Sequence, residues 1–149
     1  MRYPANGSTA ISGVSYFPFG APKTWTMGSI GTFSRQADTY GRLTADTSEL
    51  GNRTLSWDAS SRLTGITEPG QTSRSYGYDG LNRLTTANEA AAKAYGYDLN
   101  GNRTSETVNG TAYSYGVDGG SNRLTTSANS TQTRSYSYDA VGNTTSDGK

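Results

Sequence analysis

Residues 76–85 read "YGYDGLNRLT", and a form of this phrase returns about every twenty residues along the chain. Alignment on the aspartate gives six copies at intervals of 20, 21, 19, 20 and 21 residues. The aligned aspartates are Asp38, Asp58, Asp79, Asp98, Asp118 and Asp139. A fixed period of this length indicates a repeat architecture, in which each unit buries its surface only against its neighbours.

The letters around each aspartate predict a β-hairpin. In "YGYD" and "YSYD" the tyrosines alternate with a small residue, the period of two that sends both rings to one face of a strand. Aspartate followed by "GLN", "LNG" or "AVG" indicates a turn, because its carboxylate accepts backbone N–H groups and Gly or Asn tolerates a left-handed backbone. The stretch "NRLTT" then resumes a strand with residues that favour β-structure.

Rings and arginines recur at fixed places around the aspartates. The ring directly before the aspartate is Trp57, Tyr78, Tyr97 or Tyr138, and Val117 takes its place in the fifth copy. The earlier ring is Tyr76, Tyr95, Tyr136 and, depending on the spacing chosen, Tyr113 or Tyr115. Four or five residues after the aspartate stand Arg42, Arg62, Arg83, Arg103 and Arg123, with Asn143 in the last copy.

These rows predict two kinds of contact between hairpins. Rings on one face of neighbouring hairpins are expected to pack on one another as a ladder, each cross-strand pair contributing roughly 0.2–1 kcal/mol. The arginine is expected near the aspartate of its own or an adjacent hairpin. Its first role would be to fix register, because an exposed ion pair contributes only about 0–1 kcal/mol.

The predicted fold is all-β, with antiparallel hairpin repeats stacked into a continuous curved or spiralling sheet that is open at both ends. Residues 1–32 are expected to form a divergent N-terminal β segment of that sheet, and residues 33–149 the region of about six repeats. The stretch "EPGQ" at 68–71 predicts a type II turn and "VNGT" at 108–111 a type I′ turn. Glu89 and Lys93 stand at helix spacing, which leaves open a single helical turn or a plain loop there.

The composition excludes several classes of function. Leu, Ile, Val and Phe number 18 of 149 residues, but the net charge is only +1 and there are 11 tyrosines and 2 tryptophans, so the chain is expected to fold around aromatic rings. It is not basic enough for nucleic acid, and it lacks the ~18-residue apolar run of a membrane span. There is no cysteine and no histidine, so thiolate chemistry, the usual catalytic triads and imidazole metal sites are excluded.

The remaining candidate sites favour architecture. Six equivalent aspartates indicate turns or register rather than catalysis, and we expect neither an enzyme nor a cofactor. Residues 98–106 resemble the start of a calcium loop but carry Arg103 at the sixth place, where that loop needs glycine, and Asn109 at the twelfth, where it needs glutamate. A hairpin turn is therefore favoured there. Rings beside Asp and Asn leave glycan binding open, with Trp25 as the best candidate for an exposed ring.

The phrases "YGYDGLNRLT", "YGYDLNGNRT" and "YSYDAVGNTT" resemble the YD repeats of the rearrangement-hotspot (RHS) family, and "VSYFPFGAPKTW" resembles segments that precede such repeats. The likeness covers almost the whole chain. It implies a β-sheet strip that coils into a large hollow shell, which encloses a toxin or forms part of a cell-surface protein. The chain departs from the family in lacking the Asp-Pro-x-Gly-Leu motif that ends many such shells and supports self-cleavage, and no divergent toxin domain follows.

Two hypotheses of function are held close to even. In the first, the chain is a structural wall segment, a fragment or processed piece of a longer repeat chain that encloses a toxin domain. In the second, copies of the chain pair end to end through open strand edges into an extracellular fibre or tube. A glycan-binding adhesin is a lower alternative. Each places the protein outside the cell, at its surface, or in a bacterial secretion system.

Overall fold

The computed structural model of this chain describes residues 10–18, 20–49 and 51–149. They form fifteen β-strands joined by turns. None of these residues forms a helix, and so none offers a helix long and apolar enough to cross a membrane. The strands are β1 (Ser12–Tyr16), β2 (Pro22–Met27), β3 (Gly31–Ala37), β4 (Leu43–Ser48), β5 (Gly51–Trp57), β6 (Leu63–Thr67), β7 (Arg74–Tyr78), β8 (Leu84–Asn88), β9 (Ala92–Tyr97), β10 (Arg103–Val108), β11 (Thr111–Val117), β12 (Leu124–Ala128), β13 (Thr133–Ser135), β14 (Ser137–Tyr138) and β15 (Thr144–Ser146).

The chain divides into two compact units, Met1–Arg74 and Ser75–Lys149, with the division at the start of β7. In the first unit the strands pair antiparallel in chain order from β1 to β6, and in the second from β7 to β13, with β14 and β15 as a separate pair. Within neither unit do the first and last strands pair with each other, so neither sheet closes into a barrel. The predicted all-β fold of antiparallel, open hairpin repeats is confirmed.

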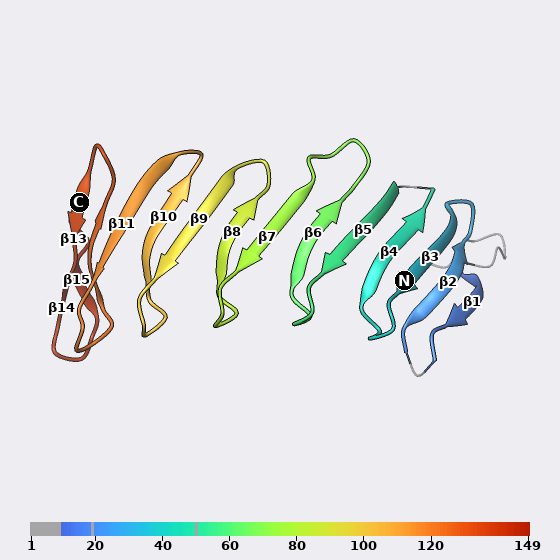
Figure 1. Ribbon diagram of the computed structural model, residues 1–149, viewed down its shortest axis with the longest axis horizontal. Helices are drawn as coiled ribbons and strands as arrows, with labels where there is room; N and C mark the ends of the chain where they lie inside the picture. Colours follow the sequence, from blue (N-terminus) through green and yellow to red (C-terminus); the bar gives the residue numbers. More distant parts are fainter. Residues whose placement is uncertain (1–9, 19, 50) are drawn as a thin grey trace. The chain divides into compact units, whose positions relative to one another are not determined.

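Each aspartate turn connects the two strands of one hairpin. Five of these turns follow β3, β5, β7, β9 and β11, and the sixth joins β14 to β15. Within each unit the turns that follow these odd-numbered strands lie on one side of the sheet, and the other connections lie on the opposite side (Figure 1). In each unit, the strand ends on one side of the sheet are therefore joined by a row of equivalent turns.

The other connections include the two turns predicted from Pro, Asn and Gly. In "EPGQ" Gly70 has a φ of 76° and the Gln71 N–H donates to the Glu68 carbonyl at 3.0 Å, as a type II turn requires. In "VNGT" Asn109 and Gly110 both have positive φ, 49° and 81°, as a type I′ turn requires. Both predictions are confirmed.

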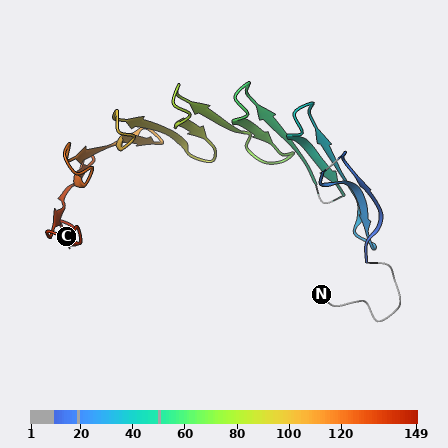
Figure 2. The same cartoon turned by 90° about the horizontal axis from the view of Figure 1, so that it is seen from below.

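Each unit consists of a single layer of strands (Figure 2). Among the described residues Ala87 in β8, 5% exposed, is the one buried apolar side chain, and no large side chain is fully buried. A second layer normally supplies the core of a sheet. These hairpins must therefore be held together by contacts along the sheet and between turns.

The strands locate the Glu89 to Lys93 stretch and the boundary predicted at residues 32 and 33. Glu89 lies in a short loop between β8 and β9, and Lys93 lies in β9, so the helical turn that their spacing allowed does not form. Five residues cannot sustain an isolated helix when their neighbours pair in a sheet. The predicted boundary at residues 32 and 33 falls inside β3, and residues 1–9 and 19 of the predicted N-terminal segment lie outside the described part.

Candidate functional site

The aspartate turns are the most regular feature of the chain, and the Asp79 turn shows their geometry. The Asp79 N–H donates to the Arg83 carbonyl at 3.0 Å, and the Asn82 N–H donates to the Asp79 carbonyl at 3.1 Å. One carboxylate oxygen of Asp79 accepts the N–H groups of Leu81 and Arg83, both at 2.9 Å. The other accepts the Arg83 Nε–H at 2.7 Å. One side chain thus closes both the backbone and the side-chain halves of the turn.

The same geometry recurs with small changes of residue. Arg42 and Arg62 donate from Nε to Asp38 and Asp58 at 2.7 Å. In two other copies asparagine takes the arginine place, and Asn102 and Asn143 each donate from Nδ2 to their aspartate at 2.9 Å. The Asp118 turn is one residue longer, and its carboxylate accepts instead from the backbone and hydroxyl of Ser121 at 2.8 and 2.7 Å.

Each turn also needs one residue in the left-handed backbone region. It stands third after the aspartate in five copies and fourth in the longer Asp118 turn. Its φ lies between 56° and 97° at Gly41, Ser61, Asn82, Gly101, Asn122 and Gly142. A type I turn followed by one left-handed residue is a common three-residue hairpin connection. Glycine and asparagine fill five of the six places because they adopt this conformation at the lowest cost.

These hydrogen bonds hold the pKa of every turn aspartate below the ordinary value of 3.8. The strongest influence is the Arg83 backbone N–H at Asp79 and the Arg62 backbone N–H at Asp58. At Asp98, Asp139 and Asp118 it is the donated side-chain hydrogen bond. At Asp38 desolvation is the largest influence and raises the pKa, but the hydrogen bonds from Arg42 and Tyr40 together outweigh it. The carboxylates therefore act as charged acceptors, which is the form a turn device needs.

The arginine of one turn also reaches the next hairpin. The Arg83 Nη1 donates to the Asp98 carbonyl at 2.7 Å, and its guanidinium lies over the Tyr97 ring at 4.7 Å. In return the Tyr97 hydroxyl donates to the Leu84 carbonyl at 2.8 Å. We call this set the clasp: the arginine and leucine carbonyl of one hairpin, with the ring and aspartate carbonyl of the next. It joins two hairpins through both a charge-assisted and a neutral hydrogen bond.

The clasp occurs in both units. In the first unit Arg42 donates to the Asp58 carbonyl at 2.7 Å and lies over Trp57 at 5.8 Å, while the Trp57 indole N–H donates to the Leu43 carbonyl at 2.7 Å. In the second, Arg123 lies over the Tyr138 ring at 5.5 Å and the Tyr138 hydroxyl donates to the Leu124 carbonyl at 2.8 Å. Either a phenol or an indole can take the ring place of the clasp, because each has an aromatic face and one polar hydrogen to donate.

One junction in the second unit is built differently. Asn102 stands in the arginine place and Val117 in the ring place of the next hairpin, so neither a guanidinium nor a hydroxyl is present. Instead, the Oδ1 of the left-handed Asn122 accepts from the Nδ2 groups of Asn102 at 2.9 Å and Asn100 at 3.1 Å. We call this set the amide junction.

The structure corrects the assignment of Arg103 to the arginine row. Arg103 opens β10, just as Leu43, Leu63, Leu84 and Leu124 open their strands, so it occupies the leucine place. Its guanidinium lies over the Tyr95 ring at 4.6 Å and meets Glu106 at 3.4 Å rather than Asp98. The variable spacing of four or five residues misled the alignment, because only the Asp118 turn contains the extra residue.

Three tyrosines of the earlier row bond through their hydroxyls to polar side chains of neighbouring strands or loops. Tyr115, and not Tyr113, holds the place that matches Tyr76, Tyr95 and Tyr136, three residues before the aspartate. The hydroxyls of Tyr76 and Tyr115 donate to Glu89 at 2.8 Å and Glu106 at 2.9 Å. The Tyr136 hydroxyl and the Ser127 hydroxyl are 3.1 Å apart. Desolvation and the bond to Glu106 raise the pKa of Tyr115 above 10.0.

The predicted ladder of ring upon ring is also corrected at three copies, since the faces of Trp57, Tyr97 and Tyr138 carry a guanidinium. In consecutive hairpins, the arginine of the preceding hairpin, rather than a second ring, lies within contact distance of each of these rings. Trp25 is not an exposed ring either: it is half-buried, it stacks on Phe33 with ring centroids 5.3 Å apart, and Arg35 lies over it at 4.9 Å. Both contacts are made by β3, and they cover part of the ring surface that a sugar ring would need.

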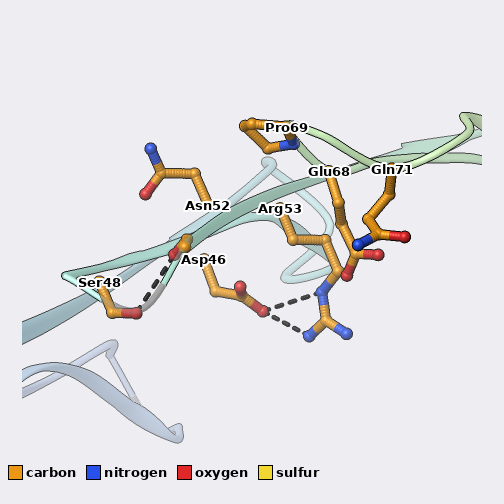
Figure 3. Close-up of a pocket in the computed structure, with 8 residues that line it drawn as sticks. Asp46, Ser48, Asn52, Arg53, Glu68, Pro69 and Gln71 are labelled. Carbon is orange, nitrogen blue, oxygen red and sulfur yellow. Dashed lines mark hydrogen bonds and ion pairs between the residues drawn. The ribbon is translucent and has the colours of Figure 1, made fainter.

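A polar cleft lies in the first unit, away from the aspartate turns (Figure 3). Asp46 and Arg53, which face each other across β4 and β5, form an ion pair, and Glu68 pairs with Arg74 across the next connection. Ser48 donates to the Gly51 carbonyl at 3.2 Å. Each carboxylate thus faces a guanidinium. The two ion pairs hold neighbouring strand ends together, and the cleft presents paired charges rather than a free acid or base.

Two parts of this arrangement are absent from the sequence-based prediction. The first is the place of Asn102 in the arginine row, together with the hydrogen bond that Asn102 and Asn143 each donate to their aspartate. The second is the side-chain acceptor in the left-handed place. In the Asp58 turn this acceptor is Ser61, whose hydroxyl receives the Arg42 Nη1 at 3.2 Å. The order of residues carries the signal: Leu follows Arg in four copies, whereas Thr104 follows Arg103.

Comparison with known proteins identifies the repeat. The RHS Repeat family matches residues 38–73 and 57–94, and none of the curated proteins compared with this chain matches it. The predicted resemblance to the RHS, or YD-repeat, family is thus confirmed for residues 38–94, which match RHS repeats.

Two solved structures with a similar fold are a Tc holotoxin pore and a TcdB2-TccC3 structure. The Tc holotoxin pore of Photorhabdus luminescens matches with a TM-score of 0.68 and 17% identity over 89% of this chain. The TcdB2-TccC3 structure matches with a TM-score of 0.70 and 14% identity over 96%. This chain covers only 8% and 9% of those chains. At such identities the likeness is one of fold.

Proposed function

We propose that this chain is a wall segment of an RHS-repeat protein, of the kind that forms a hollow shell around a toxin or a secreted or cell-surface scaffold. The observation that carries the proposal is the clasp, which joins hairpin to hairpin in both units while the described residues bury almost no core. Such a strip gains stability by length along the sheet rather than by thickness. A thin sheet that can be lengthened by adding hairpins is suited to form the wall of a shell.

The function of a wall segment is steric. A hydrogen-bonded sheet keeps proteases from what lies behind it, and no residue needs to carry a reaction. The partners in this proposal are the rest of a longer repeat chain and an enclosed toxin domain. The site of action is outside the producing cell, or the protein is delivered by a bacterial secretion system.

Limited trypsinolysis tests the barrier property on the chain itself. Arg42 and Arg83 are held by their aspartate and by the next hairpin, whereas Arg103, with 47% of its side chain exposed, is less enclosed. A wall requires cleavage after Arg42 and Arg83 to be much slower than in the urea-unfolded chain. Equal rates in the two states would show that the strip does not exclude proteases.

Enclosure itself is tested by expressing the natural reading frame that encodes this segment and imaging the product by negative-stain electron microscopy. Hollow particles that protect an internal domain from added protease support the proposal. A reading frame that gives solid or fibrous particles, with every domain open to protease, overturns it.

A second function is favoured by one observation, the exposed edge of the first unit. Strand β1 is the edge strand, and all five of its residues are exposed. Open edges recruit strands of other chains. Assembly into a fibre or tube predicts a scattering mass that grows with concentration above the 15.8 kDa of one chain, and loss of that growth in Val14→Pro. A concentration-independent mass of one chain would exclude it.

A further inference from the structure

The junctions between hairpins differ in kind, and the two positions that differ change together. Arg42 precedes Trp57, Arg62 precedes Tyr78, Arg83 precedes Tyr97 and Arg123 precedes Tyr138, whereas Asn102 precedes Val117. We propose that the residue in the arginine place and the residue before the next aspartate form a matched specificity pair. This pair determines which hairpin accepts which neighbour, and the inference holds whether the strip encloses a toxin or builds a fibre.

The arginine kind of junction depends on both members. At Arg83 and Tyr97 the guanidinium lies over the ring at 4.7 Å and donates to the Asp98 carbonyl at 2.7 Å. Without the ring the guanidinium loses its aromatic face, and without the arginine that face loses its cation. Arg42 and Trp57 repeat the arrangement in the other unit, with an indole in place of a phenol.

The asparagine kind of junction follows from the short length of the asparagine side chain. The Asn102 side chain is shorter than that of Arg83; it donates to Asp98 at 2.9 Å and meets the next turn at the Asn122 Oδ1, also at 2.9 Å. The connection is made from the other side, because the Oδ1 of Asn122 accepts from Asn102 and Asn100. Val117 fits such a junction since it brings no hydroxyl that needs an acceptor and no ring face that needs a cation.

Mixed junctions would leave one member without its partner. An arginine before Val117 would have no ring to cover its guanidinium. A ring after Asn102 would keep a hydroxyl for the neighbouring carbonyl but lack the cation over its face. The pairing rule also extends to the last hairpin, where Asn143 stands in the arginine place. A hairpin that packs against it should be of the asparagine kind, with an aliphatic residue before its aspartate and asparagine in its left-handed place.

A double-mutant cycle on the amide junction tests the rule. The variants are Asn102→Arg, Val117→Tyr and the pair together, each unfolded in urea at pH 7. We expect each single change to lower the urea concentration at the midpoint of unfolding. In the double variant the two changes should be coupled, so that its unfolding equilibrium constant is about threefold or more smaller than the single changes predict by addition. Recovery would show that arginine and ring act together.

Asn143→Arg supplies the matched control. It makes the same substitution in the same place of a turn, but the ring introduced at Val117 lies in the hairpin that precedes it, not in one that follows it. Combined with Val117→Tyr it should be additive. Coupling of the same size in this control would overturn the rule, because a general effect of added charge would then explain the recovery.

A reverse cycle keeps the rule falsifiable if the arginine variant fails to fold. Arg83→Asn and Tyr97→Val convert a clasp toward the asparagine kind, and the two losses should be less than additive, again by about threefold or more. Strictly additive losses in this cycle, or in the first where its variants fold, would show that the two positions contribute separately and that no specificity pair exists.

Discussion

The ring before each aspartate does two things at once, and its polar hydrogen is as important as its face. The Tyr97 hydroxyl and the Trp57 indole N–H both donate to a leucine carbonyl of the preceding hairpin. Both leucines open a strand that is itself paired, so the bond fixes the spacing of neighbouring hairpins. The chain thus selects among aromatic residues those with a donor and leaves phenylalanine out of this row.

Tyr97→Phe isolates that bond. The substitution keeps the ring under Arg83 and removes only the hydroxyl, so we expect a loss of about 0.5–1.5 kcal/mol in the free energy of unfolding. Tyr95→Phe on the same strand is the control, because its ring also lies under an arginine but its hydroxyl has no hydrogen-bond partner among the described residues. Urea unfolding should separate the two variants, and equal losses would contradict the role of the hydroxyl.

At the scale of the turn, the left-handed residue decides how well the hairpin closes. Asn82 and Asn122 have φ of 63° and 56°, and Ser61 holds the same place at 61°. Serine adopts this region less readily than asparagine, yet its hydroxyl serves as an acceptor for Arg42. The Asp58 turn is therefore the one whose left-handed residue fits its backbone least well.

Ser61→Asn should stabilise the chain. Asparagine is several-fold enriched in the left-handed region, which corresponds to ~0.5–1 kcal/mol, and its Oδ1 offers Arg42 the same kind of acceptor that Asn122 offers Asn102. Thermal unfolding followed by circular dichroism measures the gain. Ser60→Asn, one residue earlier and outside the left-handed region, should leave the midpoint unchanged, and an equal rise there would show a different cause.

The hairpins also depend on small cross-strand pairs next to the aspartate turn. Gly77 opposes Thr86, and a Cβ at Gly77 would lie 2.4 Å from the Thr86 hydroxyl oxygen. In the Asp58 hairpin the same pair is reversed, with Ser56 opposite Gly65. One member of the pair lacks a side chain in either arrangement, which lets the strands approach at the bulge.

Exchanging the pair tests this explanation. Gly77→Ser alone should cost about 1–3 kcal/mol in unfolding free energy through overpacking. Adding Thr86→Gly recreates the Ser56–Gly65 arrangement and should restore much of the loss, whereas Thr86→Gly alone should show no gain. A double variant as unstable as Gly77→Ser would mean that backbone conformation at Gly77, rather than the contact, sets the requirement.

The sequence predicted the elements well and the contacts between them less well. Period-two rings, a turn-forming aspartate and β-favouring residues act locally, so strands and turns followed from a few neighbouring letters. The clasp depends on which hairpin an arginine reaches, and Arg83 binds residues fifteen positions further along the chain. Arg103 was misplaced because the alignment allowed a spacing of four or five residues, whereas a single extra residue lengthens the Asp118 turn and no other aspartate turn.

On the scale of the whole molecule, stability is spread over many similar small contacts. Neither unit has a core beyond the single buried Ala87 among the described residues. Both instead repeat the aspartate turn, six times along the chain. Any condition that weakens one turn therefore weakens all of them together, and protonation of the aspartates is such a condition.

Acid should unfold the protein through these six carboxylates. Their folded-state pKa lies below 3.8, for which the backbone and side-chain donors of each turn are the cause. A carboxylate with a lowered pKa stabilises the folded state above its unfolded pKa of about 3.9, and this stabilisation is lost as pH falls through the folded-state pKa. Stability should therefore be nearly constant from pH 7 to about 5 and fall steeply below about 4.

Thermal unfolding from pH 7 to 2 measures this dependence, and Asp79→Asn calibrates it. In the acid range the unfolded chain binds more protons than the folded chain, and removing one of the six titrating groups should reduce the slope of stability against pH by up to one proton. The variant should be less stable at pH 7 but approach the unsubstituted chain as the pH falls through the folded-state pKa of the turn aspartates, where the turns lose their charged acceptors. Parallel curves for the two chains across the whole range would show that the turn carboxylates do not govern acid stability.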